Sequence, residues 1–241
     1  MQDGVNRLNH LAIIMDGNRR WAEQMTKTVR EGHEEGAKRL SDVVDWCIEL
    51  GIKCLTLFAF STENWKREKS EIDNIMSLLR RYLKSKRDDF LEKGVKIKWI
   101  GVEDGVDRDI IEDIRKLELE TKDKTVLQVN VAFNYGGRRE ILDATKRLCK
   151  QVKNGIINID DIDEMTFRNN LYYGNIVDPD LIIRTGGTNR VSNFLLWEMA
   201  YSEFFFADRF WPAFDKDLLS EIINNFEKRE RRYGGTTKKQ D

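Results

Sequence analysis

Short apolar segments that alternate with amphipathic helical segments are the feature that most limits the possible folds of this chain. Residues 10–15 (HLAIIM) and 52–60 (IKCLTLFAF) are apolar runs that each lead into a polar stretch, as buried parallel strands do. Between them, apolar side chains recur at helical spacing from Ala37 to Ile48, and Gly51 is placed to end that helix. This is the pattern of a strand–helix–strand unit.

The same two patterns alternate through the rest of the chain. The expected strands cover residues 95–100, 126–134 and 181–184, and the expected helices cover about 71–91, about 108–121, a segment after Gly137 and one from about Asp215. These elements predict an α/β fold with a single open, mostly parallel sheet flanked by helices. A length of 241 residues fits a single domain over residues 1–241, with a charged tail from about 227 to 241.

The charges of the chain are nearly balanced, which excludes some classes of partner. Lys and Arg number 41, Asp and Glu number 42, and the formal net charge is −1. Proteins that coat nucleic acids normally carry a large positive excess, so we expect no nucleic-acid partner. The three cysteines form no CxxC pair, which disfavours a disulfide framework or a zinc knuckle. With no apolar run near the roughly 18 residues of a membrane span, we expect a cytoplasmic protein.

Four polar segments follow predicted strands, and each is rich in groups that bind anions. They cover residues 16–21 (DGNRRW), 61–67 (STENWKR), 134–138 (NYGGR) and 184–193 (RTGGTNRVSN). Ligands of an open parallel sheet bind beyond the carboxyl ends of its strands, where these segments would meet. Arginine beside glycine and hydroxyl groups offers what a diphosphate needs, namely guanidinium donors and accessible backbone N–H groups. Any one such segment is more often a turn, but four at one edge predict a phosphate site.

Two further features qualify this site. Asp16 lies among arginines, where it can be an ion-pair partner or a ligand of Mg²⁺, which proteins hold with one or two carboxylates plus substrate phosphates. An apolar stripe of Ile75, Met76, Leu79 and Leu83 follows the 61–67 segment. Such a stripe is usually core, but beside an arginine cluster it would suit an amphiphile with a diphosphate head and a hydrocarbon tail.

Other phosphate and prenyl motifs are absent or isolated. The sequence has no GxxxxGK[ST] segment and no GxGxxG after a strand, so neither a P-loop nor a dinucleotide-binding fold of the usual kind is supported. The acidic run at residues 160–164 (DDIDE) occurs once, in α/β surroundings, and is interpreted as a solvated helix start rather than as part of an all-helical prenyl synthase.

Seven ordered segments resemble the successive signatures of the cis-prenyltransferases, the undecaprenyl diphosphate synthase family. They are HLAIIMDGNRRWA at 10–22, GHEEGA at 32–37, LTLFAFSTENWKR at 55–67, NVAFNYGGRREI at 130–141, DLIIRTGG at 180–187, RVSNFLLWEMAYSEFFF at 190–206 and RERRYGG at 229–235. The resemblance implies a Mg²⁺-dependent homodimer that extends an allylic diphosphate with isopentenyl diphosphate, one Z double bond at each addition. It leaves open whether the starter is farnesyl, geranylgeranyl or geranylfarnesyl diphosphate, and it implies a polyprenyl diphosphate product delivered to a membrane, at which the enzyme can be peripheral.

The resemblance also implies roles for individual residues. Asp16 would bind Mg²⁺ and help the allylic diphosphate leave, and Asn64 would accept or relay the proton lost on condensation. Because an amide is a poor base, relay is the safer chemistry. Glu203 would be a second Mg²⁺ ligand near the dimer interface, and Glu71 would orient the 61–67 segment. Substrate contacts would come from Gly17, Asn18, Arg19, Arg20, Trp21, His33, Ser61, Thr62, Glu63, Trp65, Arg67, Arg184, Arg190, Val191, Ser192, Arg232 and Gly234.

Three positions depart from the common family pattern. Arg19 replaces a glycine, as in archaeal and eukaryotic members; Val29 stands where an arginine is usual; and Asn189 stands where some bacterial members have a histidine. Three alternatives to a long-chain synthase stay open: an enzyme that stops after one or a few additions, a non-catalytic partner subunit, and a module that binds an anionic lipid or protein. The retained Asp16 and Asn64 argue against the non-catalytic subunit.

Overall fold

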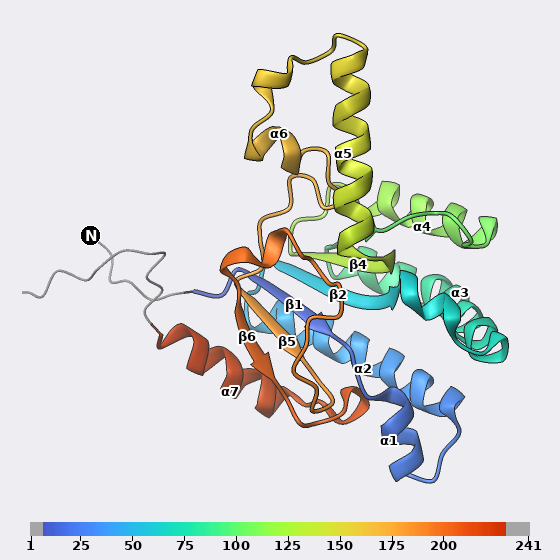
Figure 1. Cartoon of the computed structure of the whole chain (residues 1–241). Helices are drawn as coiled ribbons and strands as arrows, with labels where there is room; N and C mark the ends of the chain where they lie inside the picture. Colours follow the sequence, from blue (N-terminus) through green and yellow to red (C-terminus); the bar gives the residue numbers. More distant parts are fainter. Residues whose placement is uncertain (1–6, 230–241) are drawn as a thin grey trace, which may run out of the picture.

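A computed structural model describes residues 7–229 of the chain and contains a six-stranded sheet in which all neighbouring strands are parallel (Figure 1). The strand order is β3-β4-β2-β1-β5-β6. The strands are β1 (His10–Ile14), β2 (Cys54–Ser61), β3 (Val95–Ile100), β4 (Leu127–Tyr135), β5 (Leu181–Arg184) and β6 (Glu203–Phe206). The predicted open, parallel α/β fold is confirmed.

The helices agree with the sequence patterns except near the first strand. They are α1 (Asn18–Gln24), α2 (Val29–Glu49), α3 (Lys69–Glu92), α4 (Arg108–Thr121), α5 (Gly137–Lys153), α6 (Glu164–Arg168) and α7 (Lys216–Glu227), with short 3₁₀ turns η1 (Thr62–Lys66), η2 (Ile159–Asp161), η3 (Glu198–Tyr201) and η4 (Trp211–Ala213). The polar segment at 16–21 contains the start of α1, and α2 begins at Val29, before the stretch from Ala37 to Ile48 in which the sequence shows helical spacing. The acidic run does start a helix, because Asp163 accepts a hydrogen bond from the Thr166 N–H at 2.7 Å.

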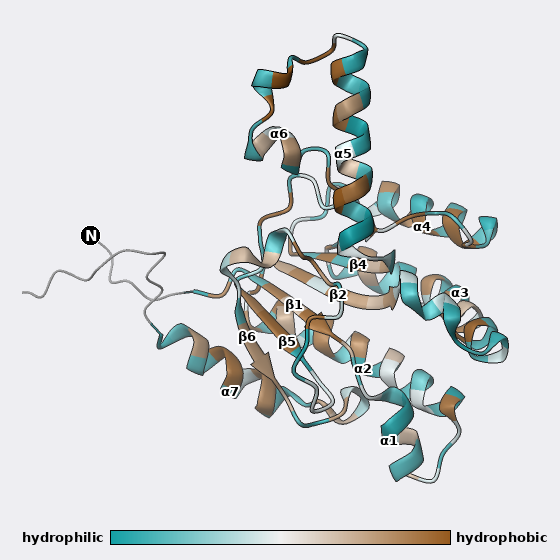
Figure 2. Cartoon of the chain, viewed as in Figure 1, coloured by the Kyte–Doolittle hydropathy of each residue, from teal (hydrophilic) through white to brown (hydrophobic). Residues whose placement is uncertain are grey.

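Both faces of the sheet are buried by core residues. Successive side chains of a strand point to opposite faces, so neighbouring residues belong to different clusters. Leu11 and Ile13 of β1 belong to a core cluster that includes buried residues of α2, α3, α4 and α7. Ala12 and Ile14 belong to a second cluster, which includes Ala144 of α5 and Phe194. Figure 2 shows the resulting pattern, with apolar strands in the middle of the molecule and polar surfaces on the outward faces of the helices. In residues 7–229, no helix combines the length and apolar character needed to cross a membrane.

The strand order places the four polar segments side by side. Strands β4, β2, β1 and β5 are consecutive in the sheet, and the four predicted segments lie at the carboxyl ends of these strands. Parallel strands direct their carboxyl ends to one edge, so segments separated by up to about 170 residues in sequence meet there.

Candidate active site

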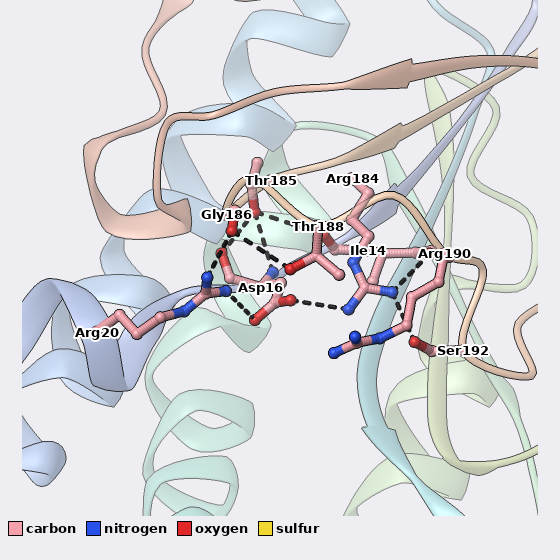
Figure 3. A network of polar contacts seen from close by, with 9 residues as sticks. All are labelled: Ile14, Asp16, Arg20, Arg184, Thr185, Gly186, Thr188, Arg190 and Ser192. Carbon is pink, nitrogen blue, oxygen red and sulfur yellow. Dashed lines mark hydrogen bonds and ion pairs between the residues drawn. The ribbon is translucent and has the colours of Figure 1, made fainter.

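Asp16 is held between two guanidinium groups at this edge of the sheet (Figure 3). Its Oδ1 accepts a hydrogen bond from Arg20 Nη2 at 3.0 Å, and its Oδ2 accepts one from Arg184 Nη2 at 2.8 Å. The backbone is fixed as well, because the Asp16 N–H donates to Thr185 Oγ1 at 3.0 Å and the Thr185 hydroxyl donates to the Asp16 carbonyl at 2.8 Å. The carboxylate thus joins the ends of β1 and β5.

Arg184 is the most buried charged group of this cluster, with 4% of its surface exposed. Its Nη1 donates to the carbonyl of Arg190 and to Ser192 Oγ, both at 2.6 Å. Its Nε has no hydrogen-bond partner among the described residues. A buried guanidinium with an unused donor favours an anionic ligand, because an unpaired buried donor costs free energy.

The start of α1 requires a glycine and fixes Arg20. Gly17 has φ = 110°, and a Cβ there would lie 2.8 Å from a ring carbon of Phe210; a larger residue would be strained and would clash. Arg20 donates to the Gly186 carbonyl at 2.7 Å, and its guanidinium lies 5.2 Å from the centre of the Phe210 ring. Arg20 is therefore oriented by three separate contacts.

Arg19 and Arg30, which are close to Arg20 in sequence, pair with glutamates and not with Asp16. Arg19 lies 4.0 Å from Glu23, and 62% of its side chain is exposed. Arg30, next to the Val29 departure, donates to Glu34 at 3.1 Å. Neither guanidinium contacts Asp16 among the interactions of the described residues, so the cationic group around Asp16 consists of Arg20 and Arg184.

His33, Arg67 and Glu71 form a second polar group. Glu71 Oε1 lies 3.3 Å from His33 Nε2 and accepts a hydrogen bond from Arg67 Nη1 at 3.0 Å. Burial lowers the pKa of His33, and the positive charges of Arg67 and Arg19 lower it further, against the opposing effect of Glu71. His33 is consequently neutral at neutral pH. The predicted contact between Glu71 and the 61–67 segment is present.

Asn64 lies in the 3₁₀ turn η1 that follows β2. Its Oδ1 accepts a hydrogen bond from the Ser61 N–H at 3.1 Å, and the Ser61 side chain accepts one from the backbone of Asn64. This reciprocal cap fixes the direction of the Asn64 side chain, which lines the cavity described next.

A cavity of about 700 Å³ begins at these polar groups and continues into the interior. The apolar part lies between the sheet and helices α2, α3 and α4; its walls include Ile75, Leu79, Ile97, Ile114, Val129 and Val131. The polar part is lined by ten of the predicted site residues, namely Asp16, Asn18, His33, Ser61, Glu63, Asn64, Arg67, Arg184, Arg190 and Ser192. A space with a cationic mouth and an apolar interior matches the predicted cleft for a diphosphate amphiphile.

Seven of the predicted substrate-binding residues lie elsewhere. Gly17, Arg19, Arg20, Trp21, Thr62, Trp65 and Val191 are outside the residues that line the cavity, although Arg20 contacts Asp16 directly. Arg232 and Gly234 lie outside the described residues.

The structure does not bring Glu203 to Asp16 within one chain. Glu203 begins β6 and pairs with Leu181 at the amino end of β5, whereas Arg184 pairs with Phe206 at the carboxyl end. Glu203 Oε2 accepts a hydrogen bond from Arg229 at 3.0 Å. Residues 7–229 contain no group of three or more His, Cys, Asp or Glu side chains placed to hold a metal ion. A metal shared by Asp16 and Glu203 of the same chain is therefore ruled out by the direction of the strands.

Several residues that orient the site were not assigned a role from the sequence, although Asn134, Thr185 and Asn193 lie within the polar segments at 134–138 and 184–193. Thr185 fixes the backbone of Asp16, and Phe210 supports both Gly17 and Arg20. Asn134 and Asn193 anchor the turn that carries Asn64. Each acts through a contact between segments that are far apart in the chain, which local spacing cannot reveal.

Known proteins resemble this chain over nearly its full length. The matching family model is Prenyltransf, described as "Putative undecaprenyl diphosphate synthase", and it covers residues 14–234. A tritrans,polycis-undecaprenyl-diphosphate synthase (geranylgeranyl-diphosphate specific) of Pyrococcus horikoshii is 45% identical, over 93% of this chain and 86% of the relative. A ditrans,polycis-undecaprenyl-diphosphate synthase ((2E,6E)-farnesyl-diphosphate specific) of Micrococcus luteus is 43% identical, over 94% of this chain and 91% of the relative.

A solved structure is similar in three dimensions as well. Lavandulyl diphosphate synthase from Lavandula x intermedia, in complex with dimethylallyl diphosphate, superposes with a TM-score of 0.91 at 32% identity. The match covers 94% of this chain and 98% of the other.

Proposed function

The chain belongs to the undecaprenyl diphosphate synthase family of prenyltransferases, and on this basis we propose that its reaction takes place at the Asp16–Arg184 cluster. The chain is a cis-prenyltransferase: it condenses isopentenyl diphosphate with an allylic diphosphate and adds Z isoprene units to give a polyprenyl diphosphate. The observation that carries the proposed site is the joint placement of two guanidinium groups, one carboxylate and an apolar cavity. We take residues 1–241 as one domain.

The allylic diphosphate is proposed to bind beside α1. Arg20 and His33 would donate hydrogen bonds to it, with Gly17 and Asn18 at the start of the helix and Arg19 and Trp21 at its outer side. Ionisation of the allylic carbon–oxygen bond builds negative charge on the departing diphosphate. Donors that are already oriented stabilise that charge without reorganisation, and Arg20 is so oriented by Asp16, Gly186 and Phe210.

Isopentenyl diphosphate is proposed to bind at the β5 side. Arg184, Arg190 and Ser192 would hold its diphosphate, with Val191 between them, and the turn from Ser61 to Arg67 would close over it. Asn64 would relay the proton that the condensation releases. Its Oδ1 already accepts from Ser61, so the amide is oriented but remains too weakly basic to keep the proton.

A divalent metal fits the mouth of the cavity together with a diphosphate. Mg²⁺ is commonly held by one or two carboxylates plus phosphate oxygens, and Asp16 supplies one carboxylate beside the cationic groups that would bind the phosphates. When bound, Mg²⁺ supplies neutralisation of charge on the leaving diphosphate. Asp16 would have to exchange at least one guanidinium for the metal. Glu203 could contribute only from a second copy of the chain.

A homodimer through the β6 edge is proposed for the assembly. Phe204 and Phe206 of this edge strand stack with ring centres 6.0 Å apart, and Phe206 is 38% exposed. Exposed aromatic residues on an edge strand favour pairing with another surface. Glu203 lies on the same strand, and Arg232 and Gly234 follow α7, which packs beside it in Figure 1; we propose that these residues complete the partner's site.

Purified protein is expected to consume isopentenyl diphosphate when it is given Mg²⁺ and one of three starters, namely farnesyl, geranylgeranyl or geranylfarnesyl diphosphate. Radiolabelled isopentenyl diphosphate and reversed-phase chromatography of the lipid product would measure turnover and chain length together. The two relatives named above differ in the starter that they use, so each starter is assayed separately. Absence of turnover with all three would favour the non-catalytic subunit or the lipid-binding module. A product only one or a few units longer than the starter would favour the short-chain enzyme.

We propose delivery of a long product to a membrane.

Filling the cavity is expected to shorten the product in a graded way. Val129 and Val131 are two positions apart on β4, so both side chains lie on the same face of the strand and line the cavity. Val131 is closer to the carboxyl end of the strand by about 6.6 Å. Val131→Phe should therefore stop elongation earlier than Val129→Phe, and both should give shorter chains than the unaltered protein. Chromatography of the products measures this, with thermal melting as the control for overpacking. Equal chain lengths in all three proteins would show that the chain does not grow along β4.

A further inference from the structure

We propose that Asn193 is a positioning residue, which ties the turn carrying Asn64 to the segment that holds Arg184. The inference rests on the proposed function of this site. Asn193 follows Ser192 directly, and Ser192 accepts a hydrogen bond from Arg184. Its side chain reaches the other half of the site, where the Asn193 Nδ2 donates to Glu63 Oε1 at 2.9 Å. Glu63 is the neighbour of Asn64 in the turn η1.

Asn193 is itself fixed by a third part of the chain. Its carbonyl accepts a hydrogen bond from the Gly137 N–H at 2.8 Å, and its Oδ1 accepts one from the Arg138 N–H at 2.9 Å. Its φ is 65°, in the left-handed region that asparagine adopts more readily than most residues. The residue is thus set in one orientation by the start of α5, with its amide N–H directed at Glu63.

The other side of the turn is held in the same manner by Asn134. Trp65 Nε1 donates to Asn134 Oδ1 at 2.7 Å, and Asn134 Nδ2 donates to the carbonyls of Val102 and Asp104, each at 2.8 Å. Asn134 also has a left-handed backbone, with φ = 52°. Asn64 therefore lies between two residues, Glu63 and Trp65, each of which is anchored by an asparagine in a sparsely populated conformation. Such conformations persist where the surrounding contacts over-determine them, and they are concentrated at functional sites.

The two anchors differ in what they connect. Asn134 joins the turn to the loop after β3. The two residues of this loop that it contacts, Val102 and Asp104, do not line the cavity and are not among the proposed diphosphate contacts. Asn193 joins it to the Arg184–Ser192 segment. The distance between Asn64 and the second diphosphate would therefore depend on the contact between Asn193 and Glu63. Misplacement of a reacting group by about 1 Å can cost about 100-fold in rate.

Asn193→Asp is the variant that isolates this contact. Aspartate has nearly the same shape, tolerates the left-handed backbone and keeps an oxygen to accept from Arg138. It replaces only the donor to Glu63, and it places two carboxylates against each other, which repel. We expect kcat to fall by about 100-fold, with a smaller change in the KM of the allylic starter and a melting temperature close to that of the unaltered protein.

A second substitution provides the rescue. In Asn193→Asp with Glu63→Gln, the new amide donates to the new carboxylate, so the hydrogen bond is restored in the reverse direction. We expect kcat to return to within about 10-fold of the unaltered protein. Glu63→Gln alone completes the double-mutant cycle, because its amide oxygen still accepts from Asn193. Any direct effect of Glu63 on the substrate appears in this single variant, so the double variant is compared with it and should be at least as fast.

Hydrogen exchange tests the same contact without turnover. Backbone amides of residues 61–67 should exchange faster in Asn193→Asp and regain protection in the double variant. A kcat for Asn193→Asp within about threefold of the unaltered protein, or a double variant no faster than the single one, would overturn the proposal. Unchanged protection of residues 61–67 would also overturn it. If the unaltered protein turned over no substrate with any starter, the proposed function would fail, and the exchange data would still decide whether the contact holds the turn.

Discussion

Asp16→Ala is expected to abolish turnover, with kcat lowered by about 1,000-fold or more, while the fold is retained. Asp16 is the carboxylate between Arg20 and Arg184, and it is the proposed ligand for the metal that neutralises the departing diphosphate. Its backbone is held by Thr185 and not by its own side chain, so truncation leaves the end of β1 in place. The rate is measured with saturating substrates and Mg²⁺, and folding by circular dichroism.

Although Asp16→Ala should lose turnover, we expect it to bind a diphosphate more tightly than the unaltered protein when no metal is present. In Asp16→Ala, Arg20 and Arg184 lose the negative charge that they share, so their guanidinium groups become available to another anion. Inorganic diphosphate should bind the variant more tightly than the unaltered protein in the presence of a chelator, which calorimetry measures. Asp16→Asn is the matched control, since it keeps the size of the side chain and one acceptor but removes the charge. Turnover of Asp16→Ala above about a tenth of the original rate would contradict the role assigned to Asp16.

Most of the sheet could be predicted because the information is local. Residues 95–100 and 181–184 form β3 and β5 within the expected bounds, and β2 and β4 are shifted by only one or two residues. Each is a run of mostly apolar residues between polar segments, so burial on both faces of a parallel sheet is visible in the sequence itself. The position of the site followed from the same information through the rule that ligands bind at the carboxyl edge.

Strand β6 could not be predicted in the same way. Glu203–Phe206 is a four-residue strand inside a long aromatic stretch, residues 194–206, that has no Gly or Pro to mark its ends. The strand is recognised only by its pairing with β5, about 20 residues earlier in the chain, and the residues of β6 themselves carry no local signal of this pairing. The direction of β6 places Glu203 at the amino edge of the sheet, opposite to Asp16. The motif that implied a metal ligand contains no information about this direction.

The contacts that orient the site were also beyond the sequence. Phe210 packs against Gly17 and Arg20, and Asn193 contacts Glu63, across about 190 and 130 residues respectively. The near-zero net charge likewise describes the whole surface and conceals the convergence of Arg20 and Arg184 on one carboxylate. Residue types at the strand ends predicted a site for a phosphate group, whereas tertiary packing determines which arginine is buried and which, like Arg19, is exposed.

Arg184→Lys is expected to weaken binding of isopentenyl diphosphate far more than binding of the starter. The guanidinium of Arg184 donates to Asp16, to the Arg190 carbonyl and to Ser192 Oγ at once. A lysine ammonium is a compact charge without the planar fork, so it cannot make these contacts and also present a donor to a diphosphate. We expect the KM for isopentenyl diphosphate to rise by at least about 10-fold, with the starter KM changed by less than about threefold.

Arg20→Lys is the matched variant for the other half of the site. Arg20 has the same charge and the same carboxylate partner, but it contacts Gly186 and Phe210 at the start of α1. Its replacement should raise the KM of the allylic starter and leave that of isopentenyl diphosphate nearly unchanged. Two variants with opposite selectivity would support two diphosphate sites that share Asp16. If both variants raised the same KM, the assignment of the β1 side to the starter and the β5 side to isopentenyl diphosphate would be wrong, because a single anion would then be contacting both arginines.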